Sequence, residues 1–384
     1  MTTVSNPLTI QVKETDRRTQ ILRLNRLSAQ ALETMFDSRQ KLFRQRVLQT
    51  GRGLVHEGIS HRYTLISLLG LRRWETAGFE SPISVAETLD HLLEDTGWVE
   101  NLGDLGLLMW LCAQAAPDRV HEIDSAFRLK DALARFPEAR QRRTMELSWF
   151  LSGLAHWRLA CPNAPSQTRD LAMECYRLLK SNQGEHGLFS HLADKKGFSG
   201  LMRGRIGSFA DQIYPVYALA KFSQAWGLSK ANERALDCAL TLCELQGPLG
   251  QWWWHYDAVT RRVLERYPVY SVHQDGMAPM ALFALGEAVE SDFSPWIFKG
   301  LQWIYGDNEL EEDLCDSSTK MIWRCIHRKD YKKHWDAALA LLAAREDGHN
   351  HTNLAVLCEC RPYHLGWLLY AWADFARDPG EPRL

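Results

Sequence analysis

The sequence predicts an all-α protein of six to seven helical hairpins that close into one ring, an α/α toroid. Two observations carry this prediction. A Gln-x-x-x-Gly-x-aromatic turn recurs at helix ends. Strongly apolar segments also alternate with amphipathic ones, with apolar residues at i, i+3, i+4 and i+7 rather than in period-two runs. The repeats are irregular, which favours a closed ring over an open solenoid with the same pattern.

The turn occurs in two strong copies and one faint copy. Residues 183–189 read Gln-Gly-Glu-His-Gly-Leu-Phe and residues 246–252 read Gln-Gly-Pro-Leu-Gly-Gln-Trp, an offset of 246 − 183 = 63. Residues 302–308 keep the Gln and the Gly but lose the aromatic residue, after 302 − 246 = 56. A period of this length at a helix end is typical of stacked helical hairpins.

A second repeat follows each strong turn. Asp211-x-x-x-Pro215 and Asp275-x-x-x-Pro279 each lead into an apolar segment, with an offset of 275 − 211 = 64. Proline is tolerated in the first turn of a helix, and an aspartate there can cap free N–H groups. Each Asp therefore has a structural interpretation beside a catalytic one.

The periodicity gives an order of helices along the chain. In each pair the second member is the more apolar, so we expect it to form the buried inner wall. The predicted outer and inner members are 27–48 with 60–72, 84–95 with 103–115, 121–134 with 145–158, 167–181 with 209–223, 231–245 with 273–286, 295–304 with 315–327, and 332–346 with 361–375.

Composition limits the classes of function. The chain has 384 residues and a net charge of −2, which argues against a nucleic-acid partner. No apolar run is long enough to span a membrane and no signal peptide is recognisable, and nine scattered cysteines fit reduced thiols in the cytoplasm. We expect a toroid domain over 21–377 between a flexible tail at 1–20 and a short tail at 378–384. The oligomeric state is left open.

The recurring turn resembles the terpenoid cyclase and protein prenyltransferase superfamily, whose members carry Gln-x-x-x-Gly-x-Trp turns in an α/α toroid. The match includes Gln246, Gly250 and Trp252 and covers mainly 170–310. The resemblance implies an enzyme that acts on an isoprenoid or isoprenoid-like substrate by proton-initiated chemistry in an aromatic cavity. The Asp-x-Asp-Asp and Asp-Asp-x-x-Asp motifs of the cyclases are missing.

The zinc ligands of the prenyltransferase branch are also incomplete. Asp275-Gly-Met277 resembles an Asp-Gly-Cys stretch of that branch and His364 its later Tyr-His, but a thioether is a poor zinc ligand. Cys358-x-Cys360 with His364 offers three ligands and no obvious fourth. We therefore expect no metal and no cofactor.

Polar residues are dense at the predicted N-termini of the inner helices. In a toroid these ends open on one rim, where free N–H groups and helix dipoles favour anionic substrate groups. Glu57, Glu146, Gln212, Gln274 and Asp316 belong to this set without an assigned role. We assign proton-handling roles to Asp275, Asp211 and His273, and substrate binding to His61, Arg62, Asp104, Trp252, Trp253, Trp254, His255, Tyr256, Lys320, Arg361 and His364.

These residues fit two substrate classes. Trp and Tyr faces stabilise carbocations, and Asp275 or Asp211 could hold the proton for alkene protonation. Equally, Trp faces stack on sugars, and His273 with Asp275 could act as acid and base on a uronic acid whose carboxylate Arg62 or Arg361 holds. The isoprenoid reaction is the first hypothesis. A glycan-active epimerase, lyase or hydrolase of polysaccharide metabolism is the alternative, and a non-catalytic helical scaffold is the third.

Overall fold

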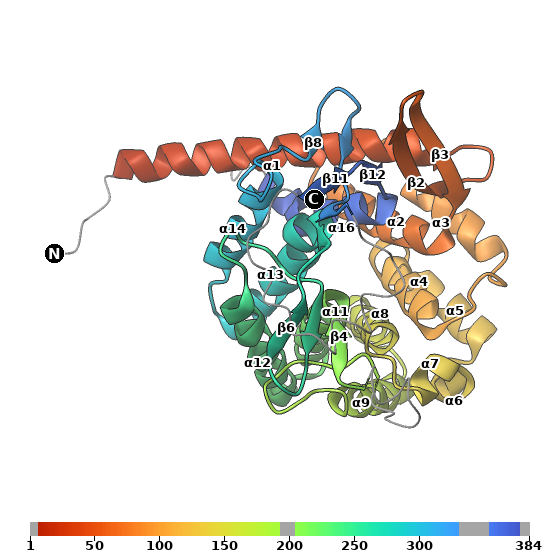
Figure 1. Cartoon of the computed structure of the whole chain (residues 1–384). Coiled ribbons are helices and arrows are strands. Elements are labelled where there is room, and N and C mark those ends of the chain that lie inside the picture. The colour runs from red at the N-terminus through yellow and green to blue at the C-terminus, as the bar shows by residue number, and fades with distance from the viewer. Residues whose placement is uncertain (1–6, 193–203, 330–352, 377–384) are drawn as a thin grey trace.

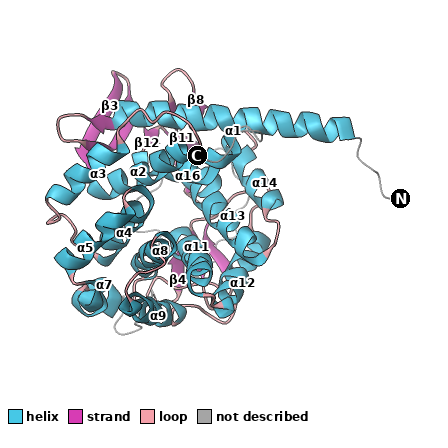
Figure 2. Cartoon of the chain, turned by 180° about the vertical axis from the view of Figure 1, so that it is seen from behind, coloured by secondary structure: helices cyan, strands magenta, loops and turns pink. Residues whose placement is uncertain are grey.

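The computed structural model describes residues 7–192, 204–329 and 353–376, and its helices form two concentric rings (Figures 1 and 2). Most inner helices are apolar on nearly every face, whereas outer helices such as that of residues 85–94 bury one face. The inner ring contains α2 (His61–Thr76), α4 (Leu102–Ala115), α8 (Thr144–Ala160), α11 (Phe209–Trp226), α13 (Ala278–Val289) and α16 (Pro362–Ala376). The outer ring contains α1 (Pro7–Met35), α3 (Val85–Glu94), α5 (Val120–Phe127), α6 (Ala132–Arg135), α7 (Pro137–Arg140), α9 (Ser166–Lys180), α12 (Ser229–Leu245) and α14 (Ser294–Ile304).

Each inner helix packs against the next, and α16 packs against α2, so the ring is closed. Glycines allow the closest of these approaches. A Cβ on Gly70 of α2 would overlap the backbone of Gly366 in α16, and one on Gly106 of α4 would overlap that of Phe150 in α8. The predicted closed toroid is confirmed, and it closes with six inner helices in the described part of the chain.

The recurring turn links successive outer helices through side-chain hydrogen bonds. Gln183 Nε2 donates to the carbonyl of Gly187 in its own turn and to that of Arg234 in α12, both at 2.9 Å. Gln246 Nε2 donates in the same way to Gly250 and to Trp296 in α14, both at 3.0 Å. The turn that recurs in the sequence therefore has a structural role.

Short strands occupy the connections, which the sequence did not predict. Sheets are formed by β1 (Phe36–Asp37), β2 (Leu42–Thr50), β3 (Gly53–Ile59) and β12 (Glu359–Cys360); by β4 (Ile206–Ser208), β5 (His255–Asp257) and β6 (Arg262–Glu265); by β7 (Val269–Tyr270), β10 (Cys325–Arg328) and β11 (Leu354–Leu357); and by β8 (Cys315–Asp316) with β9 (Met321–Ile322). All described pairings are antiparallel. The strands are short or half-exposed, so their apolar residues do not give a clear period of two.

Several predicted helices differ from the observed elements. The inner helix expected over 315–327 is instead β8, β9 and the start of β10, and the helix expected over 27–48 ends at Met35. The helix expected over 121–134 is broken into α5, the 3₁₀ turn Leu129–Asp131 and α6. The helix expected over 332–346 lies outside the described residues. Without an inner helix over 315–327, the described inner helix that follows α13 is α16, so six described inner helices stand where seven were predicted.

The predicted domain limits are not tested, although α1 already begins at Pro7, within the segment expected to be a tail. The predicted tail at 378–384 is outside the described residues. Among the residues that the structure describes, no helix is long and apolar enough to cross a membrane.

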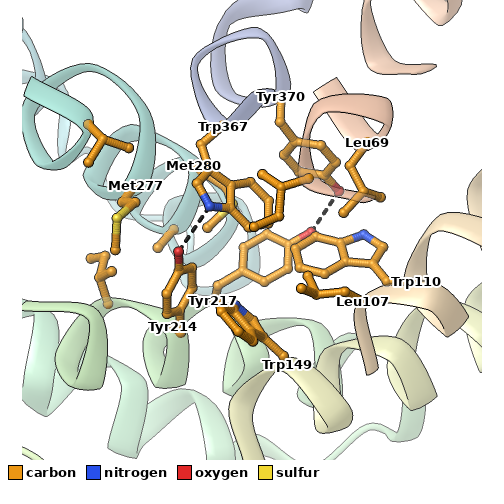
Figure 3. Close-up of a cluster of buried hydrophobic side chains, with 14 of the residues drawn as sticks. Leu69, Leu107, Trp110, Trp149, Tyr214, Tyr217, Met277, Met280, Trp367 and Tyr370 are labelled. Carbon is orange, nitrogen blue, oxygen red and sulfur yellow. Dashed lines mark hydrogen bonds between the residues drawn. The ribbon is translucent and has the colours of Figure 1, made fainter. Parts of the chain in front are cut away.

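The centre of the ring is filled by aromatic side chains (Figure 3). Trp367 Nε1 donates to the Tyr214 hydroxyl at 2.9 Å, and the hydroxyls of Tyr217 and Tyr370 are 2.8 Å apart. Trp110 stacks on Tyr217 with ring centroids 4.8 Å apart. These contacts form an aromatic plug in the centre of the ring.

Candidate active site

The mouth of the barrel, where the inner helices begin, is built by helix caps. Asn101 Oδ1 accepts from the backbone N–H of Asp104 at 3.0 Å at the start of α4. Ser208 and Asp211 cap each other's backbone N–H groups at the start of α11. These caps satisfy N–H groups that have no partner inside the helix, and they fix Asp104 and Asp211 in the first turns of two inner helices.

Arg62 of α2 and Asp104 of the neighbouring α4 form a bidentate ion pair at the mouth. Arg62 Nε and NH2 donate to the two Asp104 oxygens at 2.6 and 3.1 Å. The same guanidinium lies 5.5 Å from the ring of Trp149. The sequence predicted both members as substrate-binding residues, and the structure brings them together.

Glu146 and Trp149 lie one turn apart on the same face of α8. Gly103 makes room for them, since a Cβ there would lie 2.8 Å from Trp149 Cε3 and 3.2 Å from Glu146 Cγ. Glu146 is only 6% exposed. Burial and the nearby negative charge of Asp211 raise the pKa of its carboxyl above the ordinary value.

Both side chains carry a buried polar atom without a partner. Glu146 Oε2 and Trp149 Nε1 make no hydrogen bond to any described residue. Other buried atoms also lack a partner among the described residues, but these two lie together on one helix face at the mouth, which makes that face a candidate place for a ligand.

Asp211 pairs with His191, which sequence reasoning missed. His191 Nδ1 lies 3.2 and 3.1 Å from the two Asp211 oxygens. Burial alone would raise the pKa of Asp211, but His191 and Ser208 together lower it below the ordinary value. The sequence feature that could have indicated His191 is its place two residues after the aromatic residue of the first recurring turn.

Three arginines surround one carboxylate on the opposite side of the mouth. Glu359 accepts from Arg361 Nε at 2.5 Å and forms ion pairs with Arg324 at 2.9 Å and Arg46 at 3.2 Å. Burial opposes the charge of Glu359, yet these arginines lower its pKa. Arg361 also donates to the Tyr63 hydroxyl at 2.8 Å. This side of the mouth therefore carries more positive than negative charge.

His273 lies in the mouth wall rather than beside Asp275. Its ring is 4.5 Å from that of Phe209 and 5.2 Å from that of Tyr270. Burial lowers the pKa of His273 to about 3, so the imidazole is neutral at physiological pH. The predicted pairing of His273 with Asp275 as acid and base is not formed.

Asp275 instead pairs with His364 inside the protein wall. Both carboxylate oxygens of Asp275 lie 2.8 Å from His364 Nε2. The backbone carbonyl of Asp275 accepts from Trp372 Nε1 at 2.6 Å. Asp275 is fully buried, close enough to Tyr305 and Cys315 to influence their pKa values electrostatically. The pair thus lies toward the outer layer, away from the mouth.

The three consecutive tryptophans point to different places. Trp252 packs on Phe209 inside the wall, and Trp253 packs on Tyr267, outside the mouth. Trp254 lies beside Tyr270, 5.6 Å away, and so is the one of the three placed near the mouth residues. The prediction that all three shape one cavity is not supported by these contacts.

The remaining predicted residues are dispersed. His61 stacks on Trp98 at 5.0 Å, and His255 pairs with Glu265 at 2.7 Å on the β5–β6 hairpin. Tyr256 is fully buried, and Lys320 is exposed in the turn between β8 and β9. Among the described residues, no group of three or more His, Cys, Asp or Glu side chains is arranged to hold a metal ion.

No protein-family model matches the chain, and no curated protein matches its sequence. Solved structures do match over nearly the whole length. A heparin-specific unsaturated glucuronyl hydrolase is 14% identical with a TM-score of 0.58, and the match covers 94% of this chain and 97% of that one. An unsaturated glucuronyl hydrolase from Bacillus sp. GL1, responsible for glycosaminoglycan degradation, is 14% identical with a TM-score of 0.56, covering 95% and 100%.

A possible member of glycoside hydrolase family 105 from Klebsiella pneumoniae is 12% identical with a TM-score of 0.62, covering 94% of this chain and 93% of that one. At these identities the matches show the fold. They contradict the resemblance to terpenoid cyclases and protein prenyltransferases, and with it the isoprenoid hypothesis. The recurring turn led to the wrong family because its Gln side chain joins one outer helix to the next. That structural role says nothing about the reaction. The chain has the α/α toroid fold of these glycoside hydrolases.

Proposed function

We propose that the chain is a hydrolase that acts on oligosaccharides ending in an acidic sugar, with the reaction at the mouth of the barrel. The observation that carries the proposal is the pair of unpartnered buried atoms, Glu146 Oε2 and Trp149 Nε1, beside the Arg62–Asp104 ion pair. A buried carboxyl with a raised pKa keeps the proton that an acid in glycoside hydrolysis must donate.

Glu146 is assigned as the proton donor. Its raised pKa keeps a proton on the carboxyl, which Glu146 delivers to the glycosidic oxygen as the bond to the sugar carbon breaks. His191, oriented by Asp211, takes a proton from the water whose oxygen bonds to that carbon. The products are two sugars with free hydroxyls, and the proton on His191 returns to Glu146 through solvent.

The arginines explain the preference for an acidic sugar. Arg62 lies over Trp149, and Arg361 and Arg324 gather around Glu359 on the other side. Arginine is suited to planar carboxylates because its guanidinium donates two parallel hydrogen bonds. That two of the structural neighbours are named as unsaturated glucuronyl hydrolases supports this substrate class.

The test is the turnover of an unsaturated chondroitin disaccharide, followed by the release of its two monosaccharides. Glu146→Gln is expected to lower kcat by about 10²- to 10⁴-fold with little change in KM, since the amide keeps the shape but cannot donate the proton. Glu122→Gln, on an exposed part of α5, is the matched control. A wild-type protein that consumes no acidic oligosaccharide, or a Glu146→Gln variant with full activity, would overturn the proposal.

A further inference from the structure

A second cleft is lined in part by β6 of the β5–β6 hairpin. Its volume is about 940 Å³, and Trp253 and Tyr267 form part of its lining. Four arginines also line it: Arg261, Arg262, Arg266 and Arg328. We call this the basic cleft. None of these arginines belongs to the mouth described above.

The acidic groups of the basic cleft are already occupied. Glu309 accepts from Gln251 Nε2 at 3.0 Å, Tyr267 at 2.9 Å and Trp303 Nε1 at 2.8 Å. Glu244 forms an ion pair with Arg261. The charged side chains among the described lining residues therefore sum to 4 − 2 = +2, on a chain whose net charge is −2. Such a local reversal of charge favours anions over cations.

Two of the arginines are held against aromatic faces. The Arg266 guanidinium lies 5.5 Å from the ring of Trp253, and that of Arg328 lies 6.0 Å from the ring of Tyr267. Stacking on an aromatic ring restricts the planar guanidinium, so less freedom is lost when it binds a carboxylate or a sulfate. Arg262 and Arg266 are both exposed and so are accessible to a ligand.

The basic cleft is continuous in sequence with the mouth. Trp253 lines the cleft and Trp254 packs beside Tyr270 at the mouth. Tyr267 lines the cleft, and the Cα atoms of Tyr267 and Tyr270, three residues apart, are separated by at most about 11 Å. The same two chain segments therefore contribute side chains to the mouth and to the basic cleft, and this links the two sites.

We propose that the basic cleft binds the carboxylate or sulfate groups of an acidic oligosaccharide at a distance from the sugar that enters the mouth. This inference rests on the proposed function, because it assigns to one substrate both the mouth and the cleft. It predicts that longer acidic oligosaccharides bind more tightly than disaccharides. An acidic peptide or a nucleic acid would share the charge but not this continuity with the mouth.

The test compares chondroitin sulfate disaccharide and hexasaccharide by isothermal titration calorimetry on the Glu146→Gln protein, which holds the substrate uncleaved. The hexasaccharide is expected to bind at least tenfold more tightly than the disaccharide. Adding Arg262→Ala and Arg266→Ala should remove that difference and reduce the salt dependence of binding. Arg52→Ala, an exposed arginine in the turn between β2 and β3, is the matched control.

The outcomes separate the two proposals. If the wild-type protein cleaves the disaccharide but the hexasaccharide binds no more tightly, or the double variant loses nothing, the basic cleft is refuted and the proposed function stands. If the double variant weakens hexasaccharide binding but no acidic oligosaccharide is cleaved, the hydrolase proposal fails while the cleft remains a glycan-binding site. Tighter binding of a neutral hexasaccharide than of the acidic one would also refute the cleft.

Discussion

Two buried carboxyls at the beginnings of inner helices have different surroundings. Glu146 at α8 and Asp275, in the π-helical turn His273–Met277 before α13, are both shielded from water, and burial raises the pKa of both. Asp275 is bound through both oxygens to His364, whereas Glu146 Oε2 has no partner among the described residues. Burial alone therefore does not mark a reacting group, and the unpartnered atom is the more informative sign.

The largest effect on stability is expected from breaking the satisfied pair. His364→Ala leaves Asp275 buried without its partner, which should cost about 3–5 kcal/mol of the free energy of unfolding. Chemical denaturation of wild type and variant measures the loss. His61→Ala, at the half-exposed edge of the mouth, serves as control and should cost far less. A loss below about 1 kcal/mol in His364→Ala would contradict the importance of the pair.

Glu146, whose carboxyl oxygen Oε2 has no partner among the described residues, is expected to lower the stability of the folded protein as pH rises. Because the folded-state pKa of Glu146 is raised, the folded protein binds more protons than the unfolded chain at pH values above the usual Glu pKa of about 4.3. The stability contributed by the protonated group is present below that pH and is lost as pH rises through the folded pKa. Glu146→Gln lacks this loss.

The melting temperature of Glu146→Gln relative to wild type is therefore expected to increase from acidic to neutral pH, while activity is lost. Thermal denaturation over a pH series measures this difference. A constant difference at all pH values would show that Glu146 titrates as an ordinary exposed carboxyl, and would remove the basis for its role as proton donor.

The smallest of the expected effects is the change in disaccharide binding caused by Trp149→Phe. Trp149→Phe removes an indole N–H that has no partner among the described residues, and it keeps an aromatic ring on this face of α8. Disaccharide binding should weaken by up to about tenfold, the worth of one hydrogen bond. Calorimetry on the Glu146→Gln background measures the binding change. Wild-type affinity in the variant would show that the N–H does not meet the substrate.

The sequence predicted the ring but misaligned its repeats. Gln212 bonds the backbone of Phe189 as Gln274 bonds that of Trp252, so the structural offset is 274 − 212 = 62. The position equivalent to Asp211 is therefore His273, and not Asp275. The two prolines are offset by 279 − 215 = 64, two residues more, and the π-helical turn lies in this stretch, so Asp275 came into apparent register with Asp211.

The residues of the mouth were only partly predictable for a similar reason. Arg62 and Asp104 could be recognised from charge at the start of apolar helices, and the structure joins them. Glu146 belonged to the same set of polar residues at helix starts. What distinguishes it is a carboxyl oxygen without a hydrogen-bond partner among the described residues, in a space that Gly103 of α4 leaves open. His191 lies in a connection, where no helical period indicates the direction of a side chain.

The contact between Gly70 and Gly366 has a consequence for how the chain is completed during synthesis. The first inner helix, α2, rests on α16, which is made of residues 362–376, so its apolar face is without its final neighbour until nearly all of the described chain has emerged from the ribosome. An open array can fold repeat by repeat from one end. This ring can close only after α16 has been made.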